Sequence, residues 1–176
     1  MLTLAMKSVA ALAAAAGLAY TAAEDAPLGS PYDESALKVL TEAQIADHAS
    51  LVFARADFDQ DGKMNADEFA ALSIVTAELA LLNGFIVIEN ADDPGTVALG
   101  ETTPQALSPA EHVRIEAVAR NVFYHHAGED GELSEDEFIA SERAKFAAAD
   151  LNNNGALRRG ELRIFAQRQA NLSVGA

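Results

Sequence analysis

The chain has 176 residues, enough for one domain with a hydrophobic core or for two small lobes, and half of its residues are hydrophobic. Its 27 acidic residues against 12 Lys and Arg give a formal charge of -15, which excludes the basic surface that nucleic-acid binding needs. Because Cys is absent, a disulfide framework, a thiolate metal site and a cysteine nucleophile are also excluded. The carboxylate excess instead suits cations.

The N-terminal residues 1–23 have the pattern of an export signal. Lys7 precedes an apolar run over 9–18, and small residues follow it, so we expect cleavage before Glu24 and a secreted or periplasmic protein. An uncleaved membrane anchor is the alternative, but the run is shorter than the ~20 strongly apolar residues of a spanning helix. Residues 24–40 are rich in Pro and Gly, which predicts a linker or N-terminal arm.

Helix signals flank an acidic segment in the first half of the chain. Thr41 with Gln44 three positions later forms a capping box, which predicts a helix leading into Asp57. A second helix should begin near Asn65 and end at Gly84, a residue that commonly terminates helices. The order is helix, acidic loop, helix.

The second half repeats this order. Ser108 and Glu111 form another capping box, which predicts a helix over 108–125. A short helix containing Phe138 should reach Asp150, and a last helix should follow over about 159–172. One helix-loop-helix unit buries little surface alone, so we expect an all-α fold of paired units across 41–172, in which short β-bridges can join the loops.

The segment 57–68 fits the pattern D-x-[DN]-x-[DN]-G-x5-E. Ca²⁺ requires six to eight oxygen ligands, and alternate side chains of a tight loop can converge on one ion. Gly62 allows the sharp turn, and Glu68 offers two oxygens from the first turn of the next helix. The expected ligands are Asp57, Asp59, Asp61, the Lys63 carbonyl, Asn65 and Glu68.

The segment 150–161 fits the same pattern. Arg158 stands at the ninth place and has no side-chain oxygen, so a backbone group or water must serve there. The first loop has four carboxylates at ligand positions and this one has two, which predicts tighter binding by the first. The expected ligands are Asp150, Asn152, Asn154, the Ala156 carbonyl, Arg158 through backbone or water, and Glu161.

Two complete matches argue against the alternative that these loops are only acidic turns that cap helices. Apolar residues also recur around them: Phe53 and Phe146 precede the first Asp by four positions, and Met64 and Leu157 stand at the eighth place. With these features the chain resembles the EF-hand superfamily, and with its leader it resembles small secreted bacterial EF-hand proteins. The resemblance implies calcium binding by the two loops, with eighth-place side chains pointing into the core beside a partner loop.

Two further segments fit the frame in part. Residues 126–137 keep Gly131 and Glu137 but lose two ligand positions, which predicts a structural loop paired with the last hand, or else weak ion attraction by Glu129, Asp130 and Glu132. Residues 90–101 are a possible relic hand, although the apolar run 85–88 before Asp93-Pro94-Gly95 also predicts a strand and turn. Either form of 90–101 could cover the open edge of the first loop.

No arrangement of residues indicates catalysis. The adjacent His125 and His126 lack the i, i+4 spacing of a zinc pair, and no nucleophile elbow or P-loop is present. We therefore expect a calcium-binding protein that is not an enzyme and has no membrane span once the leader is removed. It would act as a buffer or calcium-stabilised module; alternatively it is a sensor that opens an apolar groove to a protein partner.

Overall fold

A computed structural model describes residues 35–89, 94–100, 103–128 and 130–170. The chain divides into two units, Met1–Glu34 and Ser35–Ala176, and every described residue belongs to the second. The predicted export signal 1–23 lies outside the described residues, as do most of the predicted arm 24–40, positions 90–93 and 101 of the relic hand, and Glu129 of the segment 126–137.

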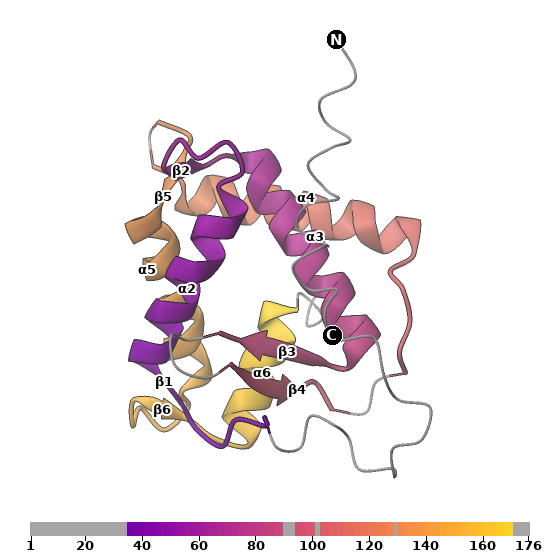
Figure 1. The fold of residues 1–176 in the computed structure, drawn as a ribbon, viewed down its shortest axis with the longest axis vertical. Coiled ribbons are helices and arrows are strands. Elements are labelled where there is room, and N and C mark those ends of the chain that lie inside the picture. Colours follow the sequence, from indigo (N-terminus) through magenta and orange to yellow (C-terminus); the bar gives the residue numbers. More distant parts are fainter. Residues whose placement is uncertain (1–34, 90–93, 101–102, 129, 171–176) are drawn as a thin grey trace. The chain divides into compact units, whose positions relative to one another are not determined.

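Helices dominate the described part of the chain, as predicted, but the all-α class is too narrow because three small antiparallel sheets accompany them. None of the helices among the described residues is long and apolar enough to cross a membrane. The elements are β1 (Leu40–Thr41), α2 (Glu42–Ala56), β2 (Lys63–Met64), α3 (Ala66–Asn83), β3 (Phe85–Ile88), β4 (Gly95–Ala98), α4 (Pro109–His126), β5 (Leu133–Ser134), α5 (Glu135–Ala149), β6 (Ala156–Leu157) and α6 (Gly160–Gln169) (Figure 1).

Capping boxes start four of the helices, including those predicted for α2 and α4. In each box the N-cap side chain accepts a backbone N–H from the third helical residue, whose own side chain accepts the N-cap N–H. Gly84 ends α3 in the left-handed conformation, φ 75°, as expected. The four pairs are Thr41 with Gln44, Asn65 with Glu68, Ser108 with Glu111, and Ser134 with Glu137.

The loop-to-loop pairing differs from the prediction. Residues 126–137 do not pair with the last loop: their strand β5 pairs with β2 of the first loop, with Met64 opposite Leu133. The last loop instead pairs through β6 with β1, with Leu157 opposite Leu40. The predicted arm therefore ends in a strand that belongs to the core.

The strand predicted over 85–88 is confirmed as β3, which pairs antiparallel with β4 from Phe85 opposite Ala98 to Ile88 opposite Gly95, while positions 90–93 of the predicted turn lie outside the described residues. This strand pair does not cover the first loop. Its side chains Ile88 and Val97 are buried with Leu157 and Phe165, near the last loop and α6. The expectation that this segment covers the open edge of the first loop is wrong for its described residues 94–100, because the partner strand of β2 is β5.

The structure contains an internal repeat with an offset of 93 residues (150 minus 57). The unit β1–α2–loop–β2 recurs as β5–α5–loop–β6, and the helices α2 and α5 have 15 residues each. The two helices lie side by side, with the β2–β5 bridge at one end of the pair and the β1–β6 bridge at the other (Figure 1). Each copy therefore pairs both of its strands with the other copy.

The main core forms one cluster beneath each bridge, and a smaller third cluster joins α3 to α4. The first cluster contains residues from the first half of α2 and the second half of α5, and the second cluster contains the equivalent residues from the first half of α5 and the second half of α2. The first contains Leu40, Ile45, Phe146, Ala149, Leu157 and Leu162, and the second contains their counterparts Leu133, Phe138, Phe53, Ala56, Met64 and Phe69.

Candidate metal centre

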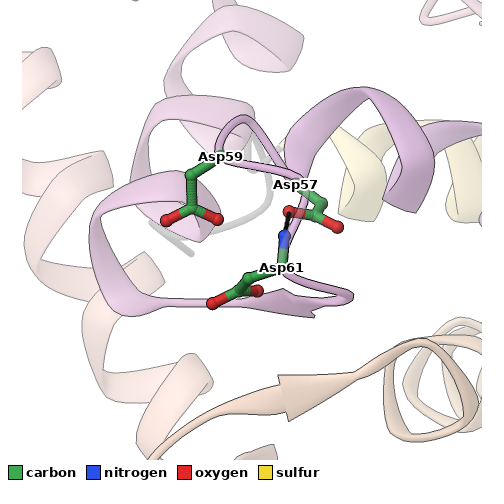
Figure 2. Close-up of side chains that lie close together, drawn as sticks. All are labelled: Asp57, Asp59 and Asp61. Carbon is green, nitrogen blue, oxygen red and sulfur yellow. Dashed lines mark hydrogen bonds between the residues drawn. The ribbon is translucent and has the colours of Figure 1, made fainter.

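Three carboxylates converge inside the turn between α2 and β2. One oxygen from each of Asp57, Asp59 and Asp61 lies within 4.8 Å of the other two (Figure 2). Asp59 and Asp61 are exposed and Asp57 is partly buried at the end of α2. These are the first, third and fifth positions of the predicted first loop, so alternate residues do meet as their spacing suggested.

Asp57 shapes the turn as well as lining it. Its two carboxylate oxygens accept the backbone N–H groups of Asp61 at 3.1 Å and Gly62 at 2.9 Å (Figure 2 marks the first). The N–H of Lys63 in turn donates to the Asp61 carboxylate at 2.9 Å. Gly62 has φ 86°, in the left-handed region that disfavours side chains with a Cβ. The loop therefore folds around its own first carboxylate.

Glu68 lies outside the triad and closes the loop by hydrogen bonds. Its carboxylate accepts the N–H of Asn65 at 2.9 Å and the N–H of Phe58 at 2.8 Å. The Asn65 side-chain oxygen accepts the N–H groups of Asp67 and Glu68 as the cap of α3. Of the predicted ligand side chains, three carboxylates are gathered, while Asn65 and Glu68 are engaged at the helix start.

The loop 150–161 repeats this arrangement. Asp150 accepts the N–H groups of Asn154 at 3.1 Å and Gly155 at 2.8 Å, and the N–H of Ala156 donates to the Asn154 side-chain oxygen at 2.9 Å. The backbone matches as well: Asn153 has φ 55° and Gly155 φ 74°, against 60° and 86° at the equivalent positions of the first loop. The turns 57–63 and 150–156, far apart in sequence, thus adopt one conformation.

The second loop differs at its closing side. The amide nitrogen of Asn152 donates to Glu161 at 2.6 Å, and the N–H of Arg158 donates to the same carboxylate at 3.3 Å. Arg158 cannot cap as Asn65 does, so α6 begins at Gly160 without a side-chain cap, and Arg159 before it has φ 47°. Only Asp150 and Glu161 bring carboxylates, so this loop lacks the three-carboxylate cluster of the first.

The positively charged side chain of Lys63, in the first loop, contacts the degenerate loop 126–137. The Lys63 ammonium group donates to Asp130 at 3.2 Å and also contacts Glu132. The hydrogen bonds that Lys63 donates to Glu132 and Asp130 raise the pKa of Lys63, and the bond to Asp130 lowers the pKa of Asp130. The sequence predicted a role only for the backbone carbonyl of Lys63. The contact of its side chain with Asp130 and Glu132 depends on the pairing of β2 with β5, which no residues near Lys63 in the sequence indicate.

The histidines form no metal site with carboxylates among the residues that the structure describes. His125 and His126 have ring centroids 5.5 Å apart, and burial lowers the pKa of His126. His48 accepts the backbone N–H of Glu89 at its Nδ1 at 3.1 Å. It therefore joins α2 to the end of β3.

No protein-family model matches this chain, and no curated protein or solved structure matches it.

Proposed function

We propose that this chain is an exported EF-hand protein that binds Ca²⁺ through the loops 57–68 and 150–161 and is stabilised by it. The observation that carries the proposal is the convergence of Asp57, Asp59 and Asp61 within 4.8 Å inside a turn whose conformation recurs in the other loop. Like charges held this close repel one another, and a divalent cation relieves that repulsion. The ordered turn supplies the place for the ion before it arrives.

The donor chemistry supports calcium rather than a transition metal. The loops offer carboxylate, amide and carbonyl oxygens, and the chain has no Cys. Such hard oxygen ligands suit Ca²⁺ and Mg²⁺, while thiolate and imidazole suit zinc and copper. A flexible ring of many oxygens favours Ca²⁺ over the smaller, strictly six-coordinate Mg²⁺.

The first loop is proposed to be the tighter site. Its four acidic ligand positions include Glu68, which can turn from its backbone partners toward an ion and give two oxygens. The second loop has two acidic positions, and the Asn152 amide must rotate to present its oxygen. Higher ligand charge raises affinity when the two turns have the same shape.

A structural or buffering role is favoured over the sensor alternative. A sensor exposes apolar side chains when calcium opens its helices. Here Phe53, Phe69, Phe123 and Phe138 are buried together beneath the β2–β5 bridge, with exposed fractions of at most 5%. Opening this cluster would disrupt the centre of the fold.

Calorimetry on the exported chain, residues 24–176, tests the proposal. We expect two calcium sites, and the variant Asp57→Asn with Glu68→Gln should lose the tighter one. Asp47→Asn, which removes an exposed charge from α2, is the matched control and should keep both.

Thermal unfolding gives a second readout. An ion at 100 times its Kd stabilises the folded state by about 2.7 kcal/mol, so the melting temperature should rise with calcium. Absence of both heat and a melting shift at millimolar calcium would rule out the proposed function. An apolar dye that binds more strongly with calcium would instead support the sensor alternative.

A further inference from the structure

The loop 126–137 keeps the closed form of a calcium loop in its second half, although it has lost two ligand positions. Gly131, at the sixth place, has φ 73°, against 86° and 74° at the same place of the two proposed calcium loops. The N–H of Ser134 donates to the Glu137 carboxylate at 2.9 Å, which is also the length of the equivalent bond in the first loop. The second half of this loop is therefore shaped like its counterparts.

Two carboxylates of this loop face one point inside the turn. Gly128 stands at the third place, and a Cβ there would lie 3.3 Å from Glu137 Oε1 and 3.4 Å from Asp130 Oδ1. Glu132, which contacts Lys63 together with Asp130, adds a third negative charge. Like charges gathered in one turn repel one another, so a positive charge beside them stabilises this form.

The positive charge that meets these carboxylates belongs to Lys63. Lys63 is the partner of Ser134 in the β2–β5 pair, and its ammonium group donates to Asp130 at 3.2 Å and also contacts Glu132. We propose that this ammonium group takes the place of a metal ion at the loop 126–137. Resting on the proposed function, Lys63 then also limits the chain to two calcium ions instead of three.

The internal repeat offers a matched comparison for this pairing of charges. At the offset of 93 residues, the counterpart of Lys63 is Ala156 in the last loop. The counterparts of Asp130 and Glu132 are Leu37 and Val39, in the segment that leads into β1. The bridges β2–β5 and β1–β6 are equivalent, yet at these positions one has a lysine with two carboxylates and the other has apolar residues. The lysine and the carboxylates occur together or not at all, as a substituted cation requires.

The ammonium group suits this loop better than calcium does. Ca²⁺ requires six to eight oxygens at about 2.3–2.6 Å, and His126 and Gly128 offer no carboxylate at the first and third places. A lysine ammonium group needs only hydrogen-bond acceptors, because it has three donors of its own. Its charge, 3.2 Å from the Asp130 oxygen, also repels a metal ion that approaches this oxygen. The loop can therefore hold its form without calcium.

Counting calcium sites by calorimetry tests the limit on the number of ions. Lys63→Arg keeps the charge and should keep the wild-type number of sites. Lys63→Gln should gain one further, weak site with a Kd of about 10⁻⁴–10⁻³ M. Adding Asp130→Asn to Lys63→Gln should remove this site again, because the new site lies in the loop 126–137. An unchanged count in Lys63→Gln, an added site in Lys63→Arg, or an added site that survives Asp130→Asn would overturn the proposal.

Hydrogen exchange in the calcium-free protein tests the role of the ammonium group separately from calcium binding. The amides of Glu132 and Ser134 should exchange about two- to fivefold faster in Lys63→Gln than in the wild type, the range expected for an exposed ion pair. Lys63→Arg should restore the wild-type rates. Lys38→Gln, which removes an exposed charge outside this loop, is the matched control and should leave them unchanged.

The two experiments separate the two proposals. Equal exchange rates in Lys63→Gln and the wild type would overturn the role of Lys63 even if calcium binds as proposed. Failure of the wild type to bind calcium would overturn the proposed function, while the exchange rates would still decide whether Lys63 stabilises the loop 126–137.

Discussion

Leu40 and Leu157 are direct partners in the antiparallel β1–β6 bridge, and the side chains of both are fully buried. One residue ends the segment whose composition predicted a linker, and the other stands at the eighth place of the last loop. Their contact closes the described part of the chain into one unit from its first strand to its last helix. A position before the first helix is therefore as central to the core as any residue within the helices.

Replacing Leu40 should measure that contribution. We expect Leu40→Ala to lower the free energy of unfolding by about 2–5 kcal/mol, because it leaves a cavity beneath the bridge. Leu151→Ala is the matched control, since Leu151 is 67% exposed and its truncation should change stability by no more than about 0.5 kcal/mol. Urea denaturation at fixed calcium provides the values. Equal effects of the two variants would mean that β1 does not belong to the core.

A second prediction concerns the backbone of the first loop. Gly62 has open space around its Cβ position but a φ of 86°, so Gly62→Ala introduces strain without a clash. We expect this variant to lower the free energy of unfolding by about 1–2 kcal/mol. Gly160→Ala has equally open surroundings at a φ outside the left-handed region, at the start of α6, and should raise stability by about 0.4–1 kcal/mol.

Denaturation of these two glycine variants in the absence of calcium separates backbone strain from metal binding. A loss of stability at Gly62 that appears only with calcium would contradict the strain argument.

The third prediction concerns pH and His48. Burial lowers the pKa of His48 below its usual 6.5, and this outweighs the nearby carboxylates of Glu142 and Glu89, which favour the charged ring; Arg55 adds to the lowering. The unfolded chain then binds more protons than the folded chain between the folded pKa and about 6.5. The free energy of unfolding should therefore fall as the pH drops through that window.

His48→Asn should flatten this part of the pH profile, because Asn can still accept the Glu89 N–H but does not titrate. Denaturant midpoints measured from about pH 7 to 5 give the comparison. Parallel profiles for wild type and His48→Asn would disprove the assignment.

Much of the local structure follows from residues close together in the chain. The capping boxes at Thr41 and Ser108 predicted the starts of α2 and α4, and Gly84 predicted the end of α3, because each signal acts within one helical turn. The triad in the first loop was predictable for the same reason. The alternate carboxylates Asp57, Asp59 and Asp61 follow a helix and precede a glycine, and they turn toward one centre.

The tertiary structure decided which loops meet. A two-residue strand such as β1 or β5 carries no periodic pattern, so the sequence could not distinguish its partner, and the last loop was assigned to 126–137 when it pairs with Leu40–Thr41. The side-chain role of Lys63 followed that pairing and was equally hidden. Short-range hydrogen bonds and turn sterics determined the conformations of the loops and the helix ends. The bridges were determined by long-range burial, because a strand's side chain is buried only when the strand pairs with the right partner in the assembled core. The buried side chains are those of Leu40, Met64, Leu133 and Leu157.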